Sequence, residues 1–262
     1  MTPREFCSFH SRALERDEVR HNVMLAAFPA ISEGQNVLTW TLGLPGQCAI
    51  MSPGKPILLA NLDEARCRTL AEQTAQLDYP GVVGPERAAP WFVGRAVELG
   101  VRFGEPIPQA IHSLVEKPKQ PGAPGAARPS TAVDAGILAD WMEAFVREAT
   151  PHDAAPSRER AQKIAAEGRH LFWIVDGRPA SMAAIARRTR NAAAIAPVYT
   201  PPALRGRGYG GSVTAAAAEQ AFAEGKTIVC LYSDLRNVPS HRCYAGIGFR
   251  PVCRSFHIPR VR

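Results

Sequence analysis

The sequence lacks several features that would identify a class of protein at once. Its 262 residues contain no uninterrupted apolar run of about 18 residues, the length that a membrane-spanning helix needs. The first twenty residues alternate charge with short apolar pieces and do not form a signal peptide. Six cysteines are present without a Cys-x-x-Cys pair, which argues against a disulfide framework and a zinc site. These absences predict a soluble, cytoplasmic protein with reduced cysteines and no bound metal.

Acidic residues are fewer than basic ones, 24 against 31, so the chain carries a formal net charge of +7. The basic residues are spread along the sequence without a long run or interleaved aromatic residues, which argues against a nucleic-acid groove. Most of them are arginines, so a codon bias could equally explain the excess. A local anion site fits better than a nucleic-acid partner.

The most irregular stretch of the chain lies near its middle. Residues 117–130 read KPKQPGAPGAARPS, with neither helical nor strand period. This composition predicts an N-terminal domain at 1–117, a Pro/Gly-rich linker at 118–129 and a C-terminal domain at 130–262. With 46% hydrophobic residues, the chain can bury a sizeable core in each.

The first domain is predicted to mix helices with short strands. Asp17 is expected to cap a helix that Pro29 ends, and Asp63 to open another through Leu77. The remaining predicted elements are strands at 36–40, 48–51 and 56–60, a turn-rich passage at 79–85 and a helix through about 99.

The second domain has clearer periodicity. Helical spacing predicts helices at 132–149 and 157–167. Strands are predicted at 171–175, 180–186 and 192–199, and the Asp176-Gly177 dipeptide is typical of a tight hairpin between the first two. An antiparallel meander follows from this pattern. A glycine-rich loop, a helix through about 223, a strand at 227–232, a short helix through 244 and a last strand at 249–257 complete the prediction.

The glycine-rich loop is the strongest candidate site. Its glycines allow close approach of a ligand, and the following helix would direct backbone N–H groups toward a pyrophosphate. Arg205 and Arg207 could bind phosphate or could be solvated surface residues. The same stretch also spells Gly-x-Gly-x-x-Gly at Gly206, Gly208 and Gly211, a dinucleotide-binding pattern. The intervening residues after the preceding strand, the upstream hairpins and the short remaining chain disfavour that alternative.

The order of elements and motifs resembles the GNAT superfamily of acetyltransferases over residues 130–262. The motifs that carry this resemblance are the loop R-G-R-G-Y-G from Arg205, Asn237 after the next strand, and the Y-x-x-x-G-F element from Tyr244 to Phe249. The resemblance implies an α/β (α+β) fold with a mixed, largely antiparallel central sheet flanked by helices. It also implies acetyl-CoA as co-substrate. The cofactor-binding residues that it implies are Val198, Tyr199, Thr200, Arg205, Gly206, Arg207, Gly208, Tyr209, Gly210, Gly211, Ser212 and Asn237.

Tyr244 matches the family position whose tyrosine often protonates the departing CoA thiolate, although an aromatic residue there could also simply pack the end of the helix. The family transfers the acyl group by direct attack of an amine in a ternary complex, so the cysteines are bystanders. A glutamate that the family often carries on the strand before the loop is missing from 192–199. The open candidates for the general base are Asp234, His152, Asp153 and Glu143.

The first domain bears a looser resemblance to the N-terminal domain of a bacterial tandem-GNAT family, through Pro80–Glu86 and the strands around Ser52-Pro53 and Leu58-Leu59. It has no R-x-x-G-x-G loop, so the resemblance implies a degenerate GNAT-like domain that binds no coenzyme A.

The expected function is that of an acetyl-CoA-dependent N-acyltransferase, a monomer or homodimer with no membrane partner. The acceptor could be a small amine, an amino acid or a protein amine. A CoA-binding regulatory or assembly module without turnover, and a dinucleotide-binding oxidoreductase, are the alternatives.

Overall fold

The computed structural model describes residues 1–151 and 154–261, and these residues form two compact units. Unit 1 comprises Met1–Ile111, Tyr232–Arg236 and Pro251–Arg262, and unit 2 comprises His112–Leu231 and Asn237–Arg250. The chain passes from one unit to the other within three strands: β5 (Ile107–Leu114), β10 (Ile228–Asp234) and β11 (Arg250–Pro259). The units therefore interleave along the sequence, which differs from the linear division expected around 118–129.

Unit 1 contains strands in the order β1-β2-β3-β4-β11. The β3–β4 pair is parallel, and the β1–β2, β2–β3 and β4–β11 pairs are antiparallel. The elements of this unit are α1 (Pro3–Leu14), a 3-10 turn (Glu15–Asp17), α2 (Asn22–Ser32), β1 (Leu38–Thr41), β2 (Cys48–Met51), β3 (Ile57–Leu59), α3 (Glu64–Thr74), β4 (Gly81–Pro85) and α4 (Ala88–Glu98).

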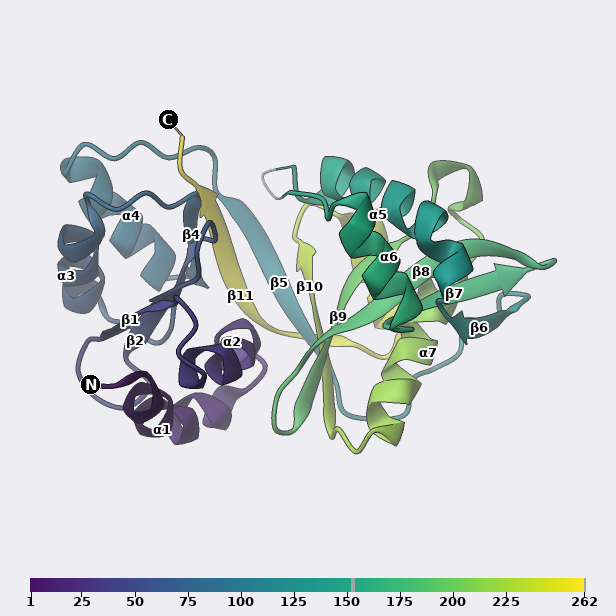
Figure 1. Cartoon of the computed structure of the whole chain (residues 1–262), viewed down its shortest axis with the longest axis horizontal. Helices are drawn as coiled ribbons and strands as arrows, with labels where there is room; N and C mark the ends of the chain where they lie inside the picture. The colour runs from purple at the N-terminus through teal and green to yellow at the C-terminus, as the bar shows by residue number, and fades with distance from the viewer. Residues whose placement is uncertain (152–153, 262) are drawn as a thin grey trace. The chain divides into compact units, whose positions relative to one another are not determined.

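Helices cover both faces of the unit 1 sheet (Figure 1). Alternate residues of β2 belong to different clusters: Cys48 and Ile50 pack with α1 and α2, whereas Ala49 and Met51 pack with α3 and α4. Side chains of a strand point to opposite faces, so a strand covered on both sides is apolar throughout. The continuous burial of β2 follows from this three-layer arrangement.

Unit 2 repeats the same general plan with strands in the order β10-β9-β8-β7-β6. The pairs from β6 to β9 are antiparallel, and β9–β10 is parallel. The elements are β6 (Ala126–Pro129), a 3-10 turn (Ala132–Asp134), α5 (Ala135–Ala149), α6 (Arg158–Ala166), β7 (His170–Val175), β8 (Arg178–Arg188), β9 (Ala192–Tyr199), a 3-10 turn (Pro202–Leu204), α7 (Tyr209–Ala223) and α8 (Val238–Ile247).

Two hydrophobic clusters hold unit 2 together. Leu171 and Trp173 of β7 pack toward α7 and α8, and Phe172 between them packs toward α5 and α6. The β7–β8 hairpin turns at Asp176 and Gly177, whose φ angles of 47° and 74° are those of a tight hairpin turn. The predicted hairpin and meander are confirmed, as are the helices at 132–149 and 157–167 within a few residues.

Two predictions for the N-terminal region are wrong. Asp17 does not open a helix: its carboxylate accepts from the backbone N–H of Arg20, and α2 begins later, at Asn22. Pro29 does not end that helix, which continues to Ser32. Burial of Ile31 at 1% exposure in the α1–α2 cluster stabilises the last turn despite the missing N–H of the proline.

Three further segments form strands that the sequence did not predict, and these are β4, β5 and β6. The turn-rich passage at 79–85 contains β4, whose glycines admit very close neighbours: a Cβ on Gly81 would lie 2.6 Å from the Ile258 carbonyl oxygen. The expected linker at 118–129 is not free chain, because residues 126–129 form β6 and pair with β7. The residues just before β6 pack on α7, as described below.

Candidate active site

The predicted glycine loop leads directly into α7. Gly206 and Gly208 have φ angles of 79° and 81°, the left-handed region that glycine adopts without strain. The helix begins at Tyr209, and the Ser212 N–H makes the first turn of the helix by donating to the Gly208 carbonyl at 3.0 Å. The N–H groups of Tyr209, Gly210 and Gly211 thus precede the helical hydrogen bonds and lie at the positive end of the helix dipole. This end can bind an anion.

The glycines of this first turn have neighbours on two different faces. A Cβ on Gly210 would lie 3.0 Å from Thr200 Oγ1, so the end of β9 closely approaches the helix there. Ser181 Oγ holds this corner together: it donates to the Tyr199 carbonyl at 2.9 Å and lies 2.8 Å from Thr200 Oγ1. On the other face, Gly211 approaches Pro121 and Cys243. Side chains at these positions would fill the space beside the first turn.

Ser212 adds an unusual polar atom to this turn. The residue is 1% exposed, and among the described residues its hydroxyl oxygen has no hydrogen-bond partner. A buried hydroxyl without a partner is costly and often marks a site that another group completes. The glycine cradle, the helix end and this hydroxyl together fit a phosphate-bearing ligand such as coenzyme A.

The two arginines of the loop, Arg205 and Arg207, differ in their contacts. Arg205 Nη2 lies 2.5 Å from Glu148 Oε2 of α5, and Arg205 Nε donates to the Thr200 carbonyl at 2.9 Å. Glu148 also accepts from the Tyr199 hydroxyl at 3.1 Å. The Arg205 guanidinium holds the pKa of Glu148 below its ordinary value, so this carboxylate stays charged. Arg207 is exposed.

Arg205 therefore ties the strand exit to α5, a role that differs from the predicted phosphate contact. The charge that Arg205 could offer a phosphate is already balanced by Glu148. Sequence reasoning missed Glu148, because it lies 57 residues before Arg205 and in no motif.

Strand β9 separates from β10 after a short paired stretch. The parallel register joins Ala192–Ala194 to Ile228–Cys230, and β9 then continues to Tyr199. Val198, Tyr199 and Thr200, which were predicted to bind the cofactor, occupy this last part of β9 and its exit. Their other edge pairs with β8 through Ala183 and Met182.

Asn237 is the N-cap of α8, and its side-chain oxygen accepts from the Ser240 N–H at 3.2 Å. This contact gives the side-chain oxygen of Asn237, a residue predicted to bind the cofactor, a capping role. The exposed side chain still presents its amide N–H groups, which can donate to a ligand.

Tyr244 lies on the inner side of α8 and is 8% exposed. Its ring is 6.0 Å from that of His112 and 6.1 Å from that of Phe249. Burial raises the pKa of the Tyr244 phenol, so it stays protonated at neutral pH. Burial also lowers the pKa of His112 to about 4. A neutral, buried phenol is what a proton donor requires, and it equally suits a packed aromatic residue.

The neighbouring thiol is not poised for nucleophilic attack. Burial raises the pKa of Cys243, which keeps it protonated. Within the described part of the chain the six cysteines are free, and no group of three His, Cys, Asp or Glu residues could hold a metal ion.

Of the four predicted base candidates, the structure describes Asp234 and Glu143, and neither is placed as a general base would be. Asp234 accepts from the backbone and side chain of Arg236, and Glu143 is exposed on α5. His152 and Asp153 lie outside the described residues.

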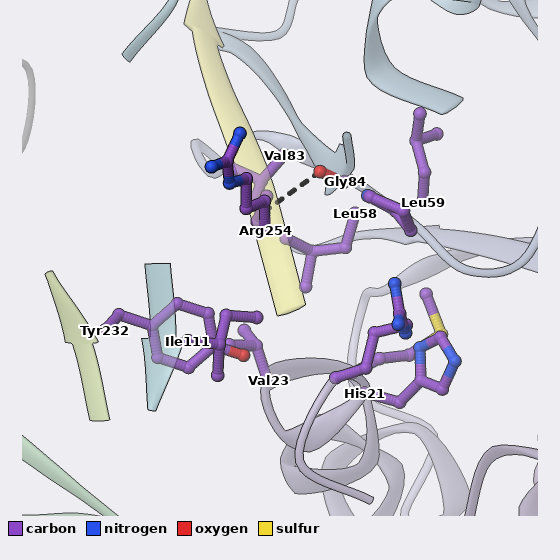
Figure 2. A pocket seen from close by; sticks show the side chains of 13 residues that line it. His21, Val23, Leu58, Leu59, Val83, Gly84, Ile111, Tyr232 and Arg254 are labelled. Carbon is purple, nitrogen blue, oxygen red and sulfur yellow. Dashed lines mark hydrogen bonds between the residues drawn. The ribbon is translucent and has the colours of Figure 1, made fainter. Parts of the chain in front are cut away.

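Unit 1 contains the counterpart of this arrangement where β3 and β4 separate (Figure 2). The parallel pairing covers Ile57 with Val82 and Leu58 with Val83. At the next position Leu59 closes the gap, since a Cβ on Gly84 would lie 2.8 Å from Leu59 Cβ. Ser255 donates to the Gly84 carbonyl at 2.9 Å, which is the dashed contact in Figure 2. The small hollow beside these residues is lined by Leu58, Val83, His21 and Arg254.

The helix that follows β3 begins very differently from α7. The Asp63 carboxylate caps α3 by accepting from the Arg66 N–H at 2.9 Å. A carboxylate at this position both satisfies the helix end and repels a phosphate. The helices α3 and α7, which follow equivalent strands, thus differ at the N-terminal N–H groups where an anion would bind.

Comparison with known proteins identifies the second unit. Residues 136–249 match the model of the acetyltransferase (GNAT) family. This match covers less than half of the chain, and over this segment it supports the resemblance to the GNAT superfamily. The match runs from α5 through the glycine loop to the Y-x-x-x-G-F element, so it includes all the predicted cofactor-binding residues and Tyr244. Below, unit 2 is called the GNAT domain. No curated protein matches the sequence.

Solved structures show the same fold at low sequence identity. A Drosophila protein of 15% identity aligns with a TM-score of 0.64, over 99% of this chain and 87% of its own. A GCN5-related N-acetyltransferase from Kribbella flavida has 19% identity and a TM-score of 0.58, over 86% of this chain and 90% of its own. A tandem GNAT protein from the clavulanic acid biosynthesis pathway has 12% identity and a TM-score of 0.52, over 86% and 83%.

The family-model match supports the predicted superfamily over residues 136–249, and the solved structures confirm the mixed, mostly antiparallel α/β fold. A GNAT domain supports acyl-CoA-dependent acyl transfer as a general activity. In the described ranges no helix is long and apolar enough to span a membrane. The largely antiparallel sheet of the GNAT domain disfavours the dinucleotide-binding alternative, which requires a doubly wound parallel sheet.

Proposed function

We propose that this chain is an acetyl-CoA-dependent N-acyltransferase whose GNAT domain binds the coenzyme and performs the reaction. The observation that carries the proposal is the start of α7. The helix begins on a glycine in the left-handed conformation, no side chain caps its N-terminal N–H groups, and the Ser212 hydroxyl beside them is buried without a partner among the described residues. The equivalent helix of unit 1 is closed by its own Asp63. This contrast supports one coenzyme site per chain, in the C-terminal half of a tandem GNAT protein with a degenerate N-terminal half.

The residues that would hold the coenzyme are those around the helix end. Backbone N–H groups from Gly206 to Gly211, with the Ser212 hydroxyl, would bind the pyrophosphate. Val198 to Thr200 would pair with the pantetheine arm, and Arg207 would add an exposed positive charge. Arg205 would act indirectly, because its bonds to Glu148 and Thr200 fix the approach of the strand to the loop.

Bound acetyl-CoA would supply the acyl group as an activated thioester, and an acceptor amine would take it. Tyr244 keeps its proton at neutral pH and would donate that proton from Oη to the leaving sulfur. Glu148 is a poor choice of base, because Arg205 lowers its pKa and hence its proton affinity. The base therefore has to come from the acceptor side or from water.

Binding is tested by thermal unfolding with acetyl-CoA. Ligand at about 100 times its Kd should add about 2.7 kcal/mol to the free energy of unfolding. Turnover is then tested by thiol release from acetyl-CoA across small amines, amino acids and peptide N-termini. Stabilisation by NADH or NADPH in place of acetyl-CoA would overturn the proposal.

One observation favours a second candidate function, a CoA-binding module without turnover. The eight residues of β9 include no carboxylate, so the strand lacks the base that many GNAT enzymes carry there. Tight binding of acetyl-CoA with no amine-dependent thiol release above background hydrolysis would support this module.

A further inference from the structure

The segment between β5 and β6 runs across the GNAT domain beside α7 (Figure 1). We name residues 119–125 the strap. Hydrogen bonds to the strap backbone hold it at both ends: the Lys119 N–H donates to the Ile247 carbonyl of α8 at 2.8 Å, and the Trp173 side chain of β7 donates through Nε1 to the Pro124 carbonyl at 2.9 Å. Between these two hydrogen bonds the sequence is Gln-Pro-Gly-Ala. Its one long polar side chain, the glutamine, is exposed.

The strap contacts two glycines of the candidate phosphate loop. A Cβ on Gly211 would lie 3.0 Å from Pro121 Cγ, and one on Gly208 would lie 3.4 Å from Ala123 Cβ. Gly210, by contrast, approaches Thr200 at the end of β9. Because successive helical residues are 100° apart, Gly208 and Gly211 share a face that Gly210 does not. The first turn of α7 thus lies between β9 on one side and the strap on another.

We propose that the strap is a third wall of the coenzyme site and that bound coenzyme holds it closed. The inference rests on the proposed function and deepens it, because it assigns coenzyme contact to a segment outside every GNAT motif. A Cβ added at Gly211 would meet Pro121 of the strap and would also lie 3.3 Å from Cys243 Sγ of α8. The strap therefore spans from α8 to α7, the two helices that carry Asn237, Tyr244 and the glycine loop. A ligand bound to both helices fixes both of the surfaces on which the strap rests.

The sequence offers a direct probe of strap opening. Trypsin cleaves after Lys or Arg unless proline follows, and between residues 112 and 130 both Lys117 and Arg128 precede proline. The Lys119–Gln120 bond is therefore the cleavable bond of this region. Cleavage there requires release of the Lys119 N–H from Ile247, and it produces fragments 1–119 and 120–262.

Coenzyme A at about 100 times its Kd should slow this cleavage by up to about 100-fold, because only the unliganded molecule would open. Lys119→Gln is the control, since it removes the trypsin site and leaves the backbone hydrogen bond in place. Thermal unfolding under the same conditions separates the two proposals. A thermal shift with unchanged or faster cleavage would overturn the strap proposal and leave the coenzyme site standing. Absence of a thermal shift would overturn the coenzyme site itself, and the strap proposal with it.

A second variant keeps the proposal testable if the bond resists trypsin in the free protein. Pro121→Ala removes, from an exposed position, the ring atoms that lie against Gly211. It should raise the KM for acetyl-CoA at least about threefold with little change in kcat. Pro106→Ala, at an exposed position of unit 1, is the matched control and should change neither. A KM unchanged by Pro121→Ala would overturn the proposal.

Discussion

The left-handed conformation of Gly208 gives the sharpest test of how α7 begins. Gly208 is the N-cap of α7, with φ and ψ of 81° and −4°. Alanine in its place would keep the loop sequence otherwise intact and would find space, since the nearest side-chain atom is 3.4 Å from the added Cβ. Any loss of stability then reports the backbone conformation and not a clash.

The expected magnitude follows from the backbone conformation. An alanine in the left-handed region costs about 1–2 kcal/mol relative to its preferred conformations. The same substitution at Gly94, in the middle of α4 and facing open space, should instead stabilise the protein by about 0.5–1 kcal/mol. The two Gly→Ala variants are chemically identical and should differ by about 2 kcal/mol. For a chain of this size that corresponds to roughly 4–8 °C between their melting temperatures.

The assay is denaturant and thermal unfolding of both variants beside the unmodified protein, without and with acetyl-CoA. Gly208→Ala should unfold more easily and also bind acetyl-CoA more weakly, because the helix-end N–H groups would no longer be directed together. Gly94→Ala should bind acetyl-CoA normally. If Gly208→Ala proved as stable as Gly94→Ala, the left-handed start of α7 and the anion site built on it would both be refuted.

Three further predictions concern charged and phenolic groups. Arg128 holds the pKa of the buried Asp134 carboxyl at about 2, below its ordinary 3.8, so the pair stabilises the fold above about pH 4 and loses this effect as pH falls toward 2. Asp134→Asn should therefore cost about 1–2 kcal/mol at pH 7 and progressively less below pH 4, and an equal cost at all pH values would contradict the ion pair. Tyr244→Phe should lower kcat about 100-fold or more where chemistry limits the rate, with little change in KM, and full turnover would refute its acid role. Glu148→Gln should cost only about 0.5 kcal/mol, because its pair with Arg205 is half-exposed, and it should raise the KM for acetyl-CoA by loosening the strand exit. A KM that stays unchanged would show that this tie does not position the loop.

The meander of the GNAT domain was predictable because its signals are local. The Asp176-Gly177 turn and the alternating strands around it lie within a few residues of one another, so the pattern and the pairing coincide. The N-terminal helix α1 was missed although its signal is present: Thr2 and Glu5 form a capping box with Pro3 between them. Strand β4 could not be found in this way, because its partner residues in β11 lie more than 170 positions later.

The same distinction between local and distant contacts separates the site residues that the sequence predicts from those that it does not. Gly208, Asn237 and Tyr244 are found from motifs, since their spacing reflects the loop and helix that carry them. The sequence could not show that Arg205 would be held by Glu148, or that Pro121 would lie against Gly211. These contacts join residues 57 and 90 positions apart, and nothing in either segment specifies its partner.

The sequence by itself determined the superfamily, the glycine loop and the order of elements in the second half, because local conformation and motif spacing encode all three. Tertiary structure alone decided what surrounds the helix end that can receive an anion. Both α3 and α7 follow a strand that starts a parallel pair; α3 is capped by its own Asp63, a local signal, whereas the first turn of α7 lies between β9 and the strap. These surroundings depend on which distant segments pack against the first turn of α7, and only the folded chain brings those atoms together.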